Sequence, residues 1–131
     1  MKFTGLAHFT IPVTDIKKAQ AFYEGTLGMR VIQGDRGNGM VFLDAGGDCV
    51  ILGQVDEPIS PVRESSIHHA FKVAPEDFEA ARAELVSKGV EIIFEEDRQG
   101  GTVNGPRFYF HDPDGNVLEI INLTSYKGDA R

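Results

Sequence analysis

Residues 107–122 read Arg-Phe-Tyr-Phe-His-Asp-Pro-Asp-Gly-Asn-Val-Leu-Glu-Ile-Ile-Asn, and they predict a β-hairpin. Two apolar runs flank the turn, in which the proline fixes its own φ and the glycine accepts a positive φ. In the second run Glu119 stands between Leu118 and Ile120, and side chains alternate along a strand. If these two neighbours face a layer of helices, Glu119 points to the opposite side. An enclosed carboxylate there needs a partner that neutralises it.

The composition is that of one globular domain without covalent cross-links. The chain has 131 residues, of which 41% are hydrophobic and 25% charged, and a formal net charge of −7. This size suffices for a real core, and the acidic balance argues against nucleic acid or an anionic membrane as a partner. The single cysteine, Cys49, excludes an intrachain disulfide. No apolar run is typical of a signal peptide or a membrane span, so we expect a cytoplasmic protein.

The two halves of the chain repeat the same order of predicted elements. Each half begins with a strand, at residues 6–13 or 67–73, and continues with a helix and three further strands. Pro12 predicts that the first strand lies at a sheet edge or leaves the pairing there, and the helix after it is expected to begin at the cap residues Thr14 and Asp15 and to end at Gly28. In the second half the strand after the helix is expected over 90–95. The matching pairs are His8 and His68, Val13 and Val73, Phe42 and Phe110, Asp44 and Asp112, and Val50 and Leu118.

The repeat predicts an α+β fold of two tandem βαβββ modules. We expect the first module over about residues 3–54, a linker over 55–65, the second module over about 66–123, and a short C-terminal tail. Neither half can bury its helix and its sheet face alone, so both halves together form one domain.

His8, His68 and Glu119 are the candidate metal ligands. Pseudo-symmetry puts the two histidines on the first strands of the two halves, and Glu119 lies on the last strand of the second. Two imidazoles and a carboxylate suit a divalent ion such as Fe, Mn, Zn, Ni or Co, with positions left open for water or substrate. His69 has the opposite strand parity, so we expect it to face the helix as a structural residue.

Several motifs point to one family, and they span nearly the whole chain. They are Gly-Leu-Ala-His-Phe-Thr-Ile-Pro-Val-Thr-Asp at 5–15, Phe-Tyr at 22–23 with Leu-Gly at 27–28, His-His-Ala-Phe-Lys-Val at 68–73, and Tyr-Phe-His-Asp-Pro-Asp-Gly-Asn-Val-Leu-Glu at 109–119. With these motifs the chain resembles the vicinal oxygen chelate superfamily of glyoxalases, bleomycin resistance proteins and extradiol dioxygenases. The resemblance implies that the modules form a cupped, incomplete barrel around a divalent metal, which chelates vicinal oxygens of a small substrate. It also implies a homodimer, and in several members strands from both chains complete the metal site.

The departures from the family narrow the choice of reaction. Matching the two hairpins puts Ile51 where Glu119 sits, so the fourth ligand of many glyoxalases is missing unless Gln54 reaches in through a different register. A metal site with three protein ligands resembles the sites of extradiol dioxygenases or of manganese-dependent fosfomycin thiol transferases. In this resemblance Tyr109 matches an active-site tyrosine of both groups, and Thr10 matches a substrate-contacting threonine of the transferases. The basic residues with which the transferases bind a phosphonate do not follow Glu119 here.

The sequence thus predicts a divalent-metal-dependent enzyme of glyoxalase or dioxygenase type, either a lyase or isomerase or a ring-cleaving oxygenase. Tyr109 and Glu119 are the expected catalytic residues, and Thr10 and Arg107 are expected to contact the small-molecule substrate, although Arg107 could instead shield a sheet edge. Two alternatives stay open: a metal-free antibiotic-binding protein of the bleomycin resistance type, and a fosfomycin-type thiol transferase. The glycine-rich segment 98–106 is either a lid over an anionic substrate or a solvated loop.

Overall fold

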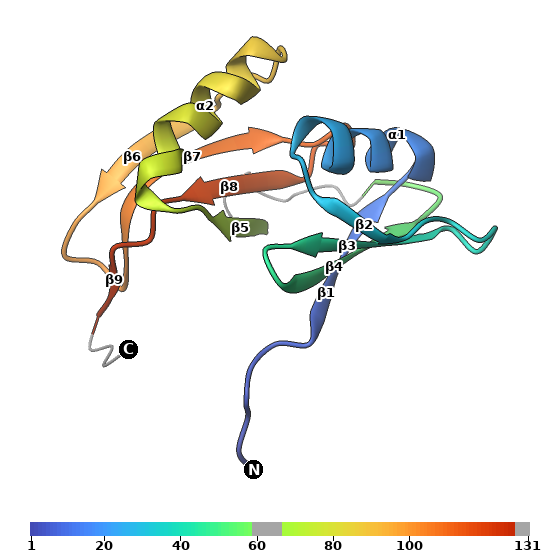
Figure 1. Ribbon diagram of the computed structural model, residues 1–131, viewed down its shortest axis with the longest axis horizontal. Coiled ribbons are helices and arrows are strands. Elements are labelled where there is room, and N and C mark those ends of the chain that lie inside the picture. The colour runs from blue at the N-terminus through green and yellow to red at the C-terminus, as the bar shows by residue number, and fades with distance from the viewer. Residues whose placement is uncertain (59–66, 128–131) are drawn as a thin grey trace. The chain divides into compact units, whose positions relative to one another are not determined.

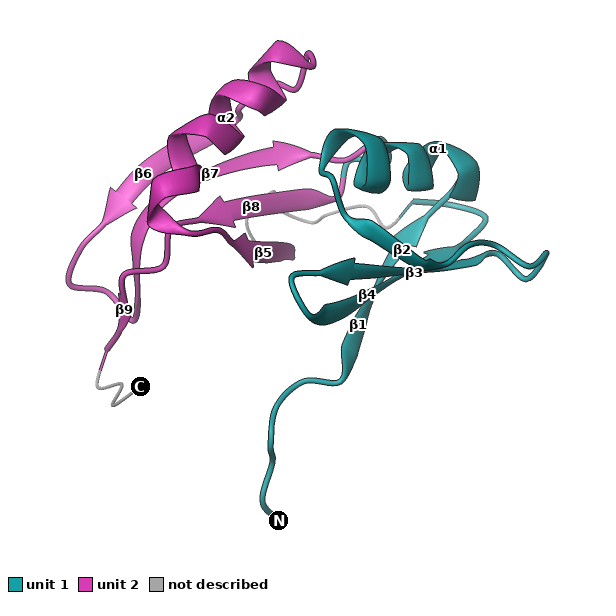
Figure 2. Ribbon diagram, viewed as in Figure 1, with its two compact units in different colours: residues 1–60, 113–115 teal, residues 61–112, 116–131 magenta. Residues whose placement is uncertain are grey.

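The computed structural model describes residues 1–58 and 67–127 and divides into two compact units (Figures 1 and 2). Unit 1 comprises residues 1–60 and the turn at 113–115, and unit 2 comprises 61–112 and 116–131. Most of the predicted linker, from residue 59 onward, and the end of the predicted tail, 128–131, lie outside the described residues. No helix within the described ranges is long and apolar enough to span a membrane.

Unit 1 is a four-stranded sheet with a helix on one face (Figure 1). Its elements are β1 (His8–Val13), α1 (Ile16–Gln20), the π-helical turn η1 (Ala21–Thr26), β2 (Arg30–Gln33), β3 (Met40–Ala45) and β4 (Asp48–Gln54). The strand order is β1-β4-β3-β2, with β1 parallel to β4 and the other pairs antiparallel. Pro12 has no N–H to donate, and it lies in the edge strand β1 as predicted.

The helix of unit 1 begins and ends where the sequence predicts. The Asp15 carboxylate accepts hydrogen bonds from the backbone N–H groups of Lys17 and Lys18, which satisfies two donors of the first turn. Gly28 follows the helix with φ +76°, a left-handed conformation that glycine adopts without strain. The helix and the sheet together bury an apolar layer: Ile11, Val13, Ala19, Tyr23, Val41, Leu43, Val50 and Leu52.

Unit 2 repeats this arrangement in its own residues. Its elements are β5 (His68–Lys72), the short 3-10 turn η2 (Pro75–Asp77), α2 (Phe78–Ser87), β6 (Phe94–Arg98), β7 (Val103–His111), β8 (Val117–Ile121) and β9 (Ser125–Tyr126). The sheet order is β5-β8-β7-β6, and β9 pairs with one end of β7. Helix α2 lies across one face (Figure 1), where the Phe78 ring packs on Phe108 with centroids 5.5 Å apart. The predicted α+β fold of two βαβββ units is confirmed.

The segment between α2 and the central hairpin differs from the prediction. A strand was expected over 90–95, whereas β6 covers Phe94–Arg98, because its register with β7 pairs Phe94 with Tyr109 and Arg98 with Gly105. The charged run at 95–97 therefore lies in an edge strand, where charges discourage pairing with another chain.

The glycine-rich loop is also shorter than predicted. Since β7 begins at Val103, only residues 99–102 connect the two strands, and Asn104 ties this turn to Gly101 with hydrogen bonds of 2.7 and 2.9 Å. Gly105 lies within β7, where a Cβ atom would stand 2.0 Å from the Asn122 carbonyl oxygen. The predicted loop over 98–106, whether a lid or a solvated loop, is therefore too long, because most of that segment is sheet.

The register of the two halves corrects two predicted correspondences, those of Phe42 with Phe110 and of Asp44 with Asp112, since Asp44 corresponds to His111. In unit 1 Ile51 pairs with Thr10 and Phe42, and in unit 2 Glu119 pairs with Ala70 and Tyr109. Phe42 therefore corresponds to Tyr109 rather than to Phe110. The reason is the turn: four residues, 45–48, separate the paired residues Asp44 and Cys49, whereas five residues, 112–116, separate the corresponding pair, His111 and Val117.

Candidate functional site

Glu119 lies in the middle of unit 2, on the central strand β8. All five residues of β8 are buried, and the Glu119 residue is 2% exposed. Leu118 and Ile120 pair with Phe110 and Phe108 beneath α2, so Glu119 points to the opposite face, as the sequence predicts. A buried carboxylate on this face requires neighbours that compensate its charge.

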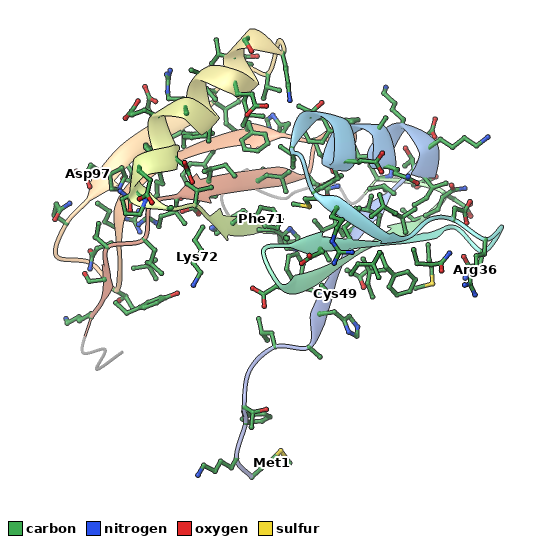
Figure 3. The ribbon with its side chains drawn as sticks, viewed as in Figure 1. Met1, Arg36, Cys49, Phe71, Lys72 and Asp97 are labelled. Atoms are coloured by element: carbon green, nitrogen blue, oxygen red, sulfur yellow. The ribbon has the colours of Figure 1, made fainter. Side chains whose placement is uncertain are left out.

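Three side chains from two neighbouring strands surround the Glu119 carboxylate. His68 on β5 places its Nε2 atom 3.3 Å from Oε2, and Arg107 on β7 places one guanidinium nitrogen 3.4 Å from Oε1. The Tyr109 ring stands edge-on to the His68 ring, with centroids 5.7 Å apart. Lys72, which has the same strand parity as His68, extends from β5 on the side away from α2 (Figure 3). The structure thus brings together four of the predicted site residues, namely His68, Arg107, Tyr109 and Glu119.

The surroundings of Tyr109 keep its hydroxyl protonated. Burial raises the pKa of Tyr109, and the negative charge of Glu119 raises this pKa further, although a hydrogen bond with Arg107 partly offsets both effects. A phenol in this state donates a hydrogen bond at neutral pH. On the helix side, burial and then the neighbouring His68 lower the pKa of His69, which agrees with its predicted structural place.

The pair of His68 and Glu119 has the spacing of two ligands on one ion. Two donor atoms that bind a metal at about 2.1 Å lie roughly 3.0 Å apart at a right angle and about 3.4 Å apart at the tetrahedral angle. The observed separation of 3.3 Å falls between these values. Over residues 1–58 and 67–127, no three His, Cys, Asp or Glu side chains gather closely enough to hold a metal. The third predicted ligand, His8, belongs to unit 1, so the complete set stays a prediction.

The corresponding face of unit 1 has different side chains. His8 and Thr10 alternate along the edge strand β1, where both are exposed. Ile51, which is 5% exposed, occupies the position of Glu119. The Gln54 amide oxygen accepts a hydrogen bond of 3.2 Å from the Ile16 backbone N–H at the start of α1, so this side chain serves the helix. Ile51 lies opposite Thr10 as Glu119 lies opposite Ala70, so the predicted match of Ile51 with Glu119 is confirmed.

Two features of the site escaped the sequence reasoning. Arg107 is only 4% exposed and contacts Glu119, whereas the sequence suggested that it contacts substrate or shields an edge. Phe94 on β6 is 56% exposed, and its ring centroid lies 5.8 Å from that of Tyr109. The parity of 107, 109 and 111 would have put Arg107 on the Glu119 face, but Phe94 could not be placed because the strand boundary was wrong.

Comparisons with known proteins agree on one family. Residues 5–120 match the Glyoxalase/Bleomycin resistance protein/Dioxygenase superfamily. The glutathione transferase FosA of Serratia marcescens is 32% identical over 117 residues, which are 88% of this chain and 78% of the relative. The metallothiol transferase FosB of Lysinibacillus sphaericus is 29% identical over 121 residues, which are 92% of this chain and 83% of the relative.

A solved structure shows the same fold. The fosfomycin resistance protein FosX of Listeria monocytogenes, in complex with Mn(II) and a dihydroxypropylphosphonic acid, superimposes with a TM-score of 0.75 at 24% identity. The match covers 94% of this chain and 93% of the FosX chain.

Proposed function

Because this chain belongs to the Glyoxalase/Bleomycin resistance protein/Dioxygenase superfamily, we propose that it is a divalent-metal-dependent transferase that adds a thiol to a small oxygen-bearing electrophile such as fosfomycin. One observation carries the proposal: His68 and a buried Glu119 meet at ligand spacing in a chain about 30% identical to thiol transferases. These relatives favour a transferase over the lyase, isomerase or dioxygenase that the sequence first suggested.

The residues of the proposed metal site have separate roles. His8, His68 and Glu119 would hold the ion, for which Mn(II) is the first choice because the FosX structure contains it. The ion would act as a Lewis acid that polarises an oxygen of the substrate. Tyr109 would donate a hydrogen bond to the oxygen on which negative charge develops, and Thr10 would contact the substrate.

The proposed transfer is a net addition. The thiol sulfur forms a bond to one carbon of the strained epoxide ring of fosfomycin, and the bond between that carbon and the ring oxygen breaks. The proton lost by the thiol ends on that oxygen, so the product is a hydroxylated thioether and nothing is oxidised or reduced. The protein must hold the two reactants together and stabilise the oxygen as it becomes negative.

The test is to incubate the protein with Mn(II), fosfomycin and either glutathione or cysteine, and to measure the adduct by mass spectrometry. We expect the adduct with the wild-type chain and its loss with Glu119→Gln or His68→Ala. Glu95→Gln is the matched control, because Glu95 pairs with Arg82 on the other side of the sheet and should leave the reaction unchanged. A protein that holds no metal and binds the antibiotic unchanged would instead be a sequestering protein of the bleomycin resistance type.

We also propose that the working form is a homodimer in which one site takes residues from both chains. His8 lies in unit 1, and His68 and Glu119 lie in unit 2, which allows two chains to share ligands. Mixing His8→Ala chains with Glu119→Gln chains tests this sharing, because a hybrid dimer with shared sites contains one intact site. Refolding the mixture should restore up to about a quarter of the wild-type activity. No restoration would place all three ligands of a site in one chain.

A further inference from the structure

Arg107 is a buried cation whose guanidinium contacts two carbonyl oxygens, the Glu119 carboxylate and the Tyr109 hydroxyl. It donates one hydrogen bond of 2.7 Å to the Val103 carbonyl and one of 3.3 Å to the Gly105 carbonyl. Its third nitrogen lies 3.4 Å from Oε1 of Glu119, and the residue is 4% exposed. An arginine in this state has little surface left with which to contact a substrate.

We infer that Arg107 is a positioning residue that fixes the Glu119 carboxylate for the metal ion, an inference that rests on the proposed function. The two oxygens of Glu119 face different partners: Oε1 faces Arg107, and Oε2 faces Nε2 of His68. Arg107 is itself held by main-chain carbonyls of its own strand, so it restrains one oxygen and leaves the other beside the imidazole. Partners of this kind around a metal ligand set its orientation and its affinity for the metal.

A purely structural role for Arg107 makes a different prediction. If the guanidinium only neutralises a buried charge, its loss should lower stability and leave the metal affinity of the folded protein unchanged or higher, because a positive charge beside the carboxylate repels the ion. A positioning role predicts weaker metal binding by the folded protein, because the carboxylate is no longer held in one orientation. Metal affinity and thermal stability must therefore be measured on the same samples.

Two substitutions of Arg107 separate charge from geometry. Arg107→Met gives unit 2 the residue that unit 1 has at the corresponding position, Met40. Arg107→Lys keeps the positive charge but lacks the planar fork that contacts two carbonyls and a carboxylate together. We expect the lysine variant to recover most of the stability and only part of the metal affinity.

Arg82 provides a matched control within the same unit. Arg82 on α2 forms its own ion pair with Glu95 at 2.8 Å, on the side of the sheet opposite Glu119. Arg82→Met removes the same charge and the same type of pair without touching Glu119. It should leave metal binding unchanged.

The experiment is a titration of each metal-free protein with Mn(II), in which the free ion is followed by its electron paramagnetic resonance signal. Arg107→Met should weaken Mn(II) binding by about 10- to 100-fold, and Arg82→Met should change it by less than about twofold. If Arg107→Met is unfolded at the titration temperature, Arg107→Lys carries the test, and its expected affinity lies below that of the wild type.

The outcomes distinguish this inference from the proposed function. Tight binding by Arg107→Met and Arg107→Lys, with loss of binding by Glu119→Gln, would overturn the positioning role and leave the metal site intact. Equal behaviour of the wild type and Glu119→Gln would overturn both. If Arg107→Met binds Mn(II) more weakly than the wild type and Arg82→Met binds it equally well, the positioning role of Arg107 is established.

Discussion

The sheets of the two units are alike on the side that their helices cover and different on the other side. The parallel pairs have the same register, since Thr10 lies opposite Ile51 in unit 1 and Ala70 lies opposite Glu119 in unit 2. Beneath the helices, both units bury large apolar side chains at corresponding positions: Val41, Leu43, Val50 and Leu52 in unit 1, and Phe108, Phe110, Leu118 and Ile120 in unit 2.

The difference lies on the uncovered face. There Met40, Phe42 and Ile51 in unit 1 correspond to Arg107, Tyr109 and Glu119 in unit 2, and only the first-strand histidine is common to both. Packing against a helix fixes the inner positions, because a change of volume in a packed core is costly. No helix of their own unit packs on the outer positions, and their side chains differ in chemistry although Ile51, Arg107 and Glu119 are all buried. One unit can therefore carry a buried charge cluster while the other carries an imidazole beside an apolar surface.

The largest effect should come from placing a carboxylate in unit 1. Ile51→Glu puts a charge at a position that is 5% exposed, where no counterpart of Arg107 exists, because Met40 occupies that place. We expect a loss of at least about 3 kcal/mol in the free energy of unfolding, measured by urea denaturation. Ile51→Val is the control and should cost about 1 kcal/mol. A loss below that of the valine control would mean that this face of unit 1 accepts a charge.

A double-mutant cycle should turn the outer face of unit 2 into that of unit 1. Glu119→Ile alone leaves Arg107 buried without its counter-charge and should cost about 3 kcal/mol of stability. Adding Arg107→Met removes that charge, so the double variant should be more stable than Glu119→Ile. The exposed pair of Arg82 and Glu95 sets the baseline, with a coupling of less than about 1 kcal/mol. Additive losses at 107 and 119 would show that the two residues are independent.

The comparison also shows how far sequence reasoning reaches. The duplication, the helix limits and the side of the sheet on which Glu119 lies follow from periodicity, caps and strand parity, all of which are local. The shift that pairs Phe42 with Ile51 depends on one additional residue in a turn, and the start of β6 depends on its pairing with β7. The ion pair between Arg107 and Glu119 depends on which strands are neighbours. Long-range pairing has no local signal, and there the predictions failed.

A smaller effect is expected from replacing Tyr109 by phenylalanine, the residue type that unit 1 has at the corresponding position, Phe42. Tyr109→Phe removes a hydroxyl that interacts with Arg107 and Glu119 but keeps the ring beside His68. We expect a stability loss of about 1 kcal/mol and a smaller loss of Mn(II) affinity than for Arg107→Met, because the hydroxyl is a partner of Glu119 but not a proposed ligand. The rate of thiol addition should fall by about 100-fold if the hydroxyl stabilises the developing charge. An unchanged rate would limit Tyr109 to packing.

The smallest effect concerns the turn of the first hairpin, where Asp44 orders the chain before the two glycines. Its carboxylate accepts a hydrogen bond of 2.7 Å from the Gly47 N–H and pairs with Arg30 at 3.0 Å, and these contacts, the first above all, lower the pKa of Asp44 below its usual 3.8. A folded-state pKa below the unfolded value stabilises the fold above pH 3.8, and this stabilisation is lost as the pH falls through the lowered pKa. Asp44→Asn should therefore lower the midpoint of thermal unfolding slightly at neutral pH, and the difference from the wild type should shrink toward pH 3. A difference that persists in acid would assign the effect of Asp44 to the geometry of the turn, since its ionisation would then contribute nothing.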